Sequence, residues 1–153
     1  MRAARFLSVL FTALALAPAM AHLLELANKI DLPRDQYLTV QHIYDGWALL
    51  GFVVYAAFFS TLALAILARR RPREFRYALA AFLCIVATQV VFWTFTFPAN
   101  QATANWTMLP EENWTALRSQ WEYSHAASAL LNVAALVAAI LAVLGSDRSA
   151  GRA

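Results

Sequence analysis

The chain has a single cysteine and few charged residues. Cys84 has no second cysteine with which to form an internal disulfide. Charged residues make up only 14% of the 153 residues, whereas a soluble domain usually carries about 25%. Nucleotide-binding loops, nucleophile elbows and HExxH zinc motifs are also absent from the sequence. These absences exclude a disulfide scaffold and argue against a soluble enzyme of any of those classes.

Apolar residues account for 61% of the chain and gather in four long runs. A helix needs about 20 apolar residues to cross the hydrocarbon core of a bilayer, and a spanning backbone must satisfy its own hydrogen bonds. The alternating ten-residue strands of a β-barrel are not present. We therefore predict an all-α fold, a four-helix transmembrane bundle forming one integral membrane domain over residues 1–153. The predicted spans are 6–26, 46–68, 77–97 and 124–145, with extracytoplasmic connections 27–45 and 98–123.

The basic residues predict the orientation. Nine of the twelve lie on one side of the predicted spans, and this side is expected to be cytoplasmic. Both termini are then cytoplasmic. The high arginine and alanine content favours a bacterial source, and the membrane is then expected to be the bacterial inner membrane. No basic face remains for a nucleic-acid partner. The nine residues are Arg2, Arg5, Arg69, Arg70, Arg71, Arg73, Arg76, Arg148 and Arg152.

The N-terminal segment has a second interpretation. Two arginines, an apolar stretch over 6–17 and the sequence Ala19-Met20-Ala21 resemble a signal peptide. Cleavage there would leave three spans and a mature chain beginning at His22. The apolar stretch continues to Leu26, however, and so reaches spanning length. We expect the first span to be retained.

The two extracytoplasmic connections resemble each other at an offset of 77 residues. This similarity predicts a parallel duplication of a helical hairpin about an axis along the membrane normal. Pro33 and Pro110 suit a first helical turn, and Gly46 is a weak helix breaker. Long helices are therefore expected to run from each proline into the following span. The matched pairs are Asn28 with Asn105, Leu32 with Leu109, Pro33 with Pro110, Asp35 with Glu112, Tyr37 with Trp114, Tyr44 with Trp121 and Asp45 with Glu122.

Each histidine has an acidic residue three positions away, on the same helix face and the same membrane side. Histidine and carboxylate ligands on facing helices hold metals in four-helix bundles, and this mixture suits iron, copper, zinc or manganese. A plain interfacial role for each pair is the alternative. A haem with His22 and His125 as axial ligands is a weaker alternative. The predicted outer-facing cup consists of His22, Glu25, His42, Asp45, Glu122 and His125.

All five tryptophans lie on the outer side or in the outer half of a span. An interfacial aromatic belt explains such a distribution, but a belt usually marks both faces of the membrane. A pocket for a small hydrophobic aromatic or quinone-like ligand is the functional interpretation. Asn132 shares a helix face with His125, although polar residues in spans more often bridge helices. The candidate substrate-binding residues are Trp47, Trp93, Trp121 and Asn132.

Two stretches carry a resemblance to a known family. AHLLELANKIDLPRDQYLTVQHIYDGWALLG and FPANQATANWTMLPEENWTALRSQWEYSHAASAL resemble the anthrone oxygenase-like family of small four-span membrane proteins. Its most specific part contains Asn100, Asn105, Trp121, Glu122 and His125. The resemblance implies a retained first span and oxidation of an aromatic substrate, and it assigns no catalytic residue.

Two classes of function remain open. One is a membrane oxidoreductase that acts on an aromatic or quinone-like substrate at the cup. The other is a non-enzymatic membrane protein that binds a small ligand or haem, or serves as a partner subunit. The lipid bilayer is an expected partner in both cases, and a homo-oligomer remains open.

Overall fold

The computed structural model describes the backbone of residues 1–150 and the side chains of residues 1–145. The predicted cytoplasmic charges of Arg148 and Arg152 lie outside the described side chains. The described chain contains helices and no strand, so the predicted all-α class is confirmed.

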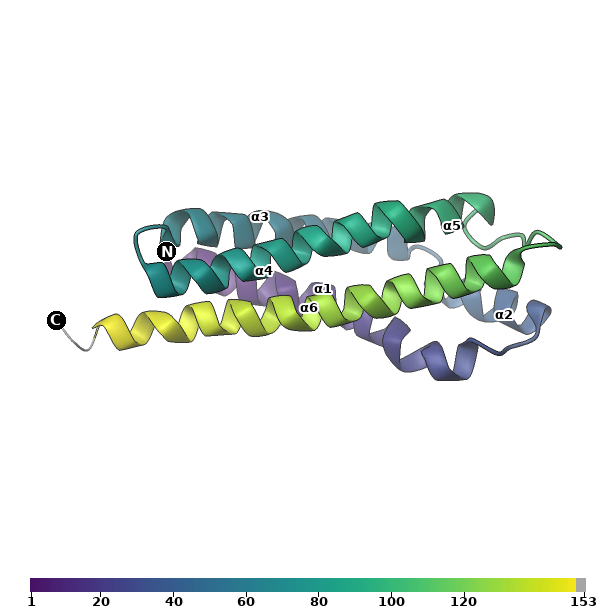
Figure 1. Ribbon diagram of the computed structural model, residues 1–153, viewed down its shortest axis with the longest axis horizontal. Coiled ribbons are helices and arrows are strands. Elements are labelled where there is room, and N and C mark those ends of the chain that lie inside the picture. The colour runs from purple at the N-terminus through teal and green to yellow at the C-terminus, as the bar shows by residue number, and fades with distance from the viewer. Residues whose placement is uncertain (151–153) are drawn as a thin grey trace.

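Four helices are long and apolar enough to cross a membrane, which makes the chain a multi-pass membrane protein. Helix α6 packs against α4 and α1, and α3 packs against the same two helices, so the four spans form a bundle. α1 begins and α6 ends at one end of this bundle, and α2 lies at the other end (Figure 1). The spans are α1 (Arg2–Lys29), η2 (Trp47–Leu50) with α3 (Gly51–Ala68), α4 (Pro72–Val91) with η3 (Phe92–Thr96) and α5 (Phe97–Ala102), and α6 (Trp114–Ala150).

Small residues fill the interior of the bundle, and large apolar residues cover its outside. Ala81 of α4 and Ala139 of α6 are fully buried in one cluster, and small residues let membrane helices approach closely. Phe52 and Phe59 of α3, by contrast, are exposed. In a soluble protein the large apolar residues would lie inside. Their position on the outside is expected of a protein surrounded by lipid.

A buried carboxylate ties three segments together at the end of the bundle where α1 begins. Glu74 of α4 accepts hydrogen bonds from Arg5 Nε at 2.8 Å and Arg5 Nη2 at 3.0 Å. Arg71, just before α4, adds a contact of 3.4 Å. A bidentate arginine–carboxylate pair has a fixed geometry, so it sets the position of α1 against α4.

The first connection departs from the predicted continuous helix. Helix α2 (Arg34–Gln41) begins after Pro33 as predicted, but the chain then forms the short helix η1 (His42–Tyr44) and turns at Gly46. Gly46 has φ +82°, a left-handed conformation that interrupts an α-helix and suits glycine. The prediction that Gly46 breaks the helix only weakly is wrong.

The second connection also differs in its details. α6 begins at Trp114, four residues after Pro110, and its 37 residues extend about 56 Å at 1.5 Å per residue. The prediction of a long fourth helix is therefore confirmed. The preceding residues Ala104, Asn105 and Trp106 all have positive φ, and this left-handed turn brings the chain back toward α6.

The contacts between the two connections support the predicted duplication. Tyr37 contacts its counterpart Trp114, with ring centroids 6.4 Å apart, and Tyr44 contacts its counterpart Trp121 at 5.6 Å. A two-fold axis brings equivalent residues together in this way. The backbone carbonyls of Leu32 and Leu109 are also equivalent, and each accepts a hydrogen bond from an arginine of the opposite connection, Arg118 and Arg34 respectively.

Candidate functional site

Two predicted site histidines lie against each other inside the bundle. His22 of α1 and His125 of α6 have ring centroids 4.0 Å apart and ring planes at 30°. Trp121, one turn before His125 on α6, packs its indole edge-on against both imidazoles, at 5.0 Å from His22 and 4.2 Å from His125. Two further aromatic rings complete the enclosure around His22: Tyr44 of the first connection at 4.4 Å and Trp47 of η2 at 5.5 Å.

The imidazole of His22 is incompletely satisfied. Its side chain is only 6% exposed, and Nδ1 is buried without a hydrogen-bond partner in the described structure. Leaving a buried polar atom unpaired costs about 1–3 kcal/mol, and unpaired atoms of this kind in native structures usually have a functional reason. A ligand or water beside His22 would satisfy Nδ1.

A cavity of about 640 Å³ lies next to the histidine pair. This volume is within the usual range for small-molecule sites, about 300–1,000 Å³. α1, α3, α4 and α6 all contribute to its wall, together with η2 and η3. Both histidines and all four predicted substrate-binding residues line it: His22, His125, Trp47, Trp93, Trp121 and Asn132. Whether the cavity binds a substrate remains a prediction.

A ring of hydrogen bonds lies beside the histidines and contains a buried lysine. Lys29 Nζ contacts Glu122 Oε1 at 3.1 Å and donates to Gln41 Oε1 at 3.3 Å. Gln41 in turn donates to the hydroxyl of Tyr37 at 3.1 Å, and Tyr37 donates to Glu122 at 2.8 Å. Because Lys29 and Glu122 are both buried, their charges compensate each other in a low-dielectric environment.

A branch of this network leads outward from Lys29. Lys29 Nζ donates to the hydroxyl of Tyr44 at 2.6 Å, and Tyr44 donates to the carboxylate of Glu25. Burial, followed by the neighbouring Glu25, raises the pKa of the Tyr44 phenol above its ordinary value. Burial and Glu122 do the same to the pKa of Tyr37. Both phenols therefore remain protonated hydrogen-bond donors at neutral pH.

The six residues of the predicted cup are not brought together as one centre. His42 Nδ1 and Asp45 Oδ2 lie 3.3 Å apart on the surface, with side chains 63% and 76% exposed. Glu25 and Glu122 contact tyrosines and Lys29. Among the residues whose side chains are described, no group of three or more His, Cys, Asp or Glu is arranged to hold a metal ion.

The histidine pair also does not fit a haem. In a bis-histidine haem the two imidazoles bind opposite faces of the iron, and metal–nitrogen bonds are about 2 Å long. The ring centroids would then be farther apart than the observed 4.0 Å. Stacked imidazoles leave no room for a porphyrin between them.

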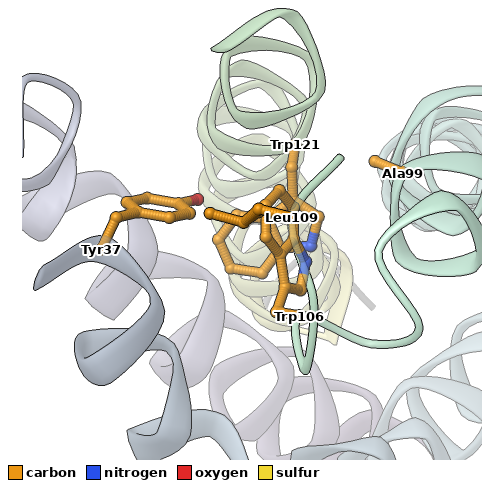
Figure 2. Packing of buried hydrophobic residues seen from close by; sticks show 5 residues of the cluster. All are labelled: Tyr37, Ala99, Trp106, Leu109 and Trp121. Carbon is orange, nitrogen blue, oxygen red and sulfur yellow. The ribbon is translucent and has the colours of Figure 1, made fainter. Parts of the chain in front are cut away.

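A cluster of aromatic residues lies over the cavity at the end of the bundle where α2 lies. Tyr37, Trp106, Leu109 and Trp121 are buried together with Ala99, and Figure 2 shows the indoles of Trp106 and Trp121 with both nitrogens turned toward the side of Ala99. Both nitrogens donate to Asn100 Oδ1, at 3.0 Å and 2.8 Å. Asn100 therefore fixes the orientation of the two indoles above the cavity.

Two features of the site were not predicted. Lys29 was counted only as a basic residue, although it lies seven positions after His22 and four after Glu25, on the same face of one helix. The π-helix η3 (Phe92–Thr96) places Phe92, Trp93 and Thr96 in the cavity wall. Pro98 is the residue in the sequence that could have indicated this irregular turn, because proline lacks an N–H and clashes with the carbonyl four residues earlier. π-Helical turns are frequent at functional sites.

The site thus combines an aromatic cavity, two stacked imidazoles and a neighbouring buried network of charges. Comparisons of the chain with protein-family models, with curated proteins and with solved structures find no match.

Proposed function

We propose that the chain is a membrane oxidoreductase that binds a planar aromatic molecule in the cavity and oxidises it with dioxygen to a quinone-like product, which the same cavity can hold. The observation that carries the proposal is the unpaired Nδ1 of His22, buried in an aromatic cavity beside a second imidazole. Aromatic walls favour a flat ligand, and the imidazole nitrogen supplies the polar contact that orients it.

The resemblance to the anthrone oxygenase-like family supports the same reaction class, and we propose that the chain belongs to this family. Four residues of the most specific part of the resemblance lie in the cavity wall: Asn100, Asn105, Trp121 and His125. Glu122 of the same stretch anchors Lys29. A bacterial cytoplasmic membrane, with both termini on the cytoplasmic side, is the location that this proposal assigns to the protein.

The chemistry requires a base rather than a shared metal centre. Two histidine nitrogens are fewer than the three protein ligands of a usual catalytic zinc site. A neutral imidazole, in contrast, can accept a proton without a metal. We assign this role to the pair of His22 and His125, which are the only histidines in the cavity wall among the residues whose side chains are described.

An anthrone illustrates the balanced reaction. The imidazole removes a proton from the CH2 group between the aromatic rings, and the resulting enolate is electron-rich enough to react with dioxygen. The CH2 carbon becomes a carbonyl carbon and keeps one oxygen atom of the O2. The second oxygen atom leaves as water with the two hydrogens of the CH2 group. Dioxygen is the oxidant and is reduced to the level of water and carbonyl oxygen.

The test measures oxygen consumption by the purified protein with anthrone as the probe. Wild-type protein should consume one O2 for each quinone formed. His22→Ala and His125→Ala should each lower the rate by about 10²-fold or more, the usual contribution of a general base. His42→Ala is the matched control, because His42 is exposed and does not line the cavity, and it should leave the rate unchanged.

Other outcomes have defined meanings. Binding of anthrone without oxygen consumption would overturn the oxidoreductase and support the alternative of a non-enzymatic ligand binder. Loss of activity on treatment with a chelator would replace the proposed base mechanism with a metal-dependent one. Absence of binding by correctly folded protein would overturn the proposed site.

A further inference from the structure

The cavity extends deep into the membrane-spanning part of the bundle. Asn132, in the cavity wall, lies thirteen residues before Gly145 on α6, which is about 20 Å along the helix. A hydrocarbon core is about 30 Å thick. Ala15 of α1 and Thr88 of α4 line the same deep part. The cavity therefore reaches about 10 Å into the hydrocarbon core from the outer side.

The outer end of the cavity is largely covered. Trp106, Leu109 and Trp121 are nearly fully buried in the aromatic cluster (Figure 2). Trp106 and Trp121 are fixed by their shared acceptor Asn100, and the reciprocal arginine–carbonyl hydrogen bonds hold the two connections together. Asp45 and Asn105 also line the cavity at this end and are exposed, so a polar opening to water lies beside the roof. An apolar molecule dissolved in the bilayer would instead reach the histidines through a side of the bundle.

One side of the cavity is bordered by aromatic residues that are also exposed on the outside of the bundle. Tyr55 of α3 and Trp93 of η3 line the cavity, yet they are 51% and 54% exposed. Residues that face both a cavity and the exterior mark its opening. Both residues belong to membrane-spanning segments, so the exterior at this level is lipid.

The wall at this opening also contains a position without a side chain. Gly51 begins α3 and lines the cavity. Its φ of −53° is an ordinary helical value, so the backbone does not require glycine there. A Cβ atom built at Gly51 has no described atom within 4 Å. Space is therefore present where a larger residue would extend into the cavity or its opening.

We propose that the natural ligand is a membrane-resident amphiphile, with a planar aromatic or quinone-like head beside His22 and His125 and an apolar tail that leaves between α3 and η3 into the outer leaflet. This inference rests on the proposed function and specifies its substrate class. A tail that stays in lipid keeps the head at the depth of the opening. The exposed side chains of Tyr55 and Trp93 contact the first part of the tail.

The test compares two probes with the same head, 2-methyl-1,4-naphthoquinone and its derivative with a 3-isoprenoid tail. Binding to the protein in lipid nanodiscs is followed by quenching of tryptophan fluorescence, with each quinone expressed as its mole fraction in the lipid. The tailed quinone should bind at least as tightly as the head alone. Gly51→Phe should weaken binding of the tailed probe by about tenfold or more and weaken binding of the head much less.

Gly145→Ala is the matched control at the opposite end of the bundle, where the nearest atoms to an added Cβ belong to the flexible Arg73 side chain at 3.7 Å or more. It should bind both probes as the wild type does. Helix content and elution volume establish that Gly51→Phe is folded. Should that variant fail to fold, Tyr55→Ala serves instead: opening the side route should speed association of the tailed probe and leave that of the head unchanged.

The remaining outcomes separate the two proposals. If the head binds and the tailed quinone binds at least about tenfold more weakly, the side opening is wrong and the proposed site stands. Equal effects of Gly51→Phe on both probes would likewise overturn the side opening. If neither probe binds to folded protein, the quinone-like ligand class of the proposed function fails, and the side opening fails with it.

Discussion

Lys29 is the residue on which the polar part of the site depends. Its ammonium group contacts two carboxylates, an amide oxygen and a phenol, and it lies 4.8 Å from the centre of the Trp121 ring. The positive charge of Lys29 is therefore balanced by the two carboxylates and stabilised by the polar oxygen atoms around it. It connects α1 to the segment between α1 and α3 and to α6, and so fixes Trp121 beside the histidines.

Lys29→Met should destabilise the protein by about 3 kcal/mol or more, because it leaves the buried Glu122 without its cation. Thermal or denaturant unfolding of the purified protein in detergent measures the change. The double variant Lys29→Met with Glu122→Gln should recover a large part of the loss, since no unpaired charge remains. Asp45→Asn is the control for an exposed pair, and its effect should stay below about 1 kcal/mol. A negligible effect of Lys29→Met would contradict the assigned pairing.

The sequence predicted part of this residue-level arrangement. His22, His125, Trp121 and Asn132 could be assigned to one region because helical spacing places them on inward faces near the outer membrane surface. The separation of His42 from the other histidines could not be predicted, because it depends on the turn at Gly46. The burial of Lys29 was also missed, since its compensation by Glu122 requires the packing of α1 against α6.

At the scale of the elements, the spans follow from hydrophobicity and the interruptions follow from local backbone chemistry. Each of the four apolar runs forms a helical span. The first, third and fourth spans extend beyond the predicted ends, because polar residues continue a helix outside the hydrocarbon core, whereas the second, Trp47–Ala68, stays within them. Two interruptions were not foreseen: the left-handed turn at Gly46 and the π-helix η3. Hydrophobicity alone gives no sign of either.

Gly46→Ala should destabilise the protein by about 1–2 kcal/mol, the cost of a left-handed conformation for a residue with a Cβ atom. No described atom lies within 4 Å of the added Cβ, so the loss has a backbone cause. Gly51→Ala is a matched control with an ordinary helical φ, and it should be neutral or stabilising by up to about 1 kcal/mol. Equal effects of the two substitutions on the unfolding free energy would contradict this explanation.

At the scale of the whole molecule, charge and aromatic residues divide between the two ends of the bundle. The Arg5–Glu74–Arg71 cluster lies at the end where α1 begins and α6 ends. The cavity, the histidine pair and the aromatic roof lie toward the opposite end. The sequence predicted that arginines and tryptophans lie at opposite ends of the bundle. Their positions relative to the four apolar runs are sufficient for this prediction.

Reporter fusions test the orientation of this asymmetric molecule. Fusions after Gly145 and within residues 69–76 should report a cytoplasmic location, because arginine-rich flanks stay on that side. A fusion near Gln101 should report the opposite side. A C-terminal fusion found outside would contradict the assignment of the cavity to the outer half of the membrane.

The pairing of Lys29 with Glu122 has a consequence for biosynthesis. Lys29 ends α1, whereas its buried partner lies on α6 and is made only after the two intervening spans have been synthesised. Until α6 arrives, the ammonium group must remain in contact with water at the membrane surface. The end of α1 that carries Lys29 therefore reaches its final environment late, and the cavity is complete only once α6 has been made.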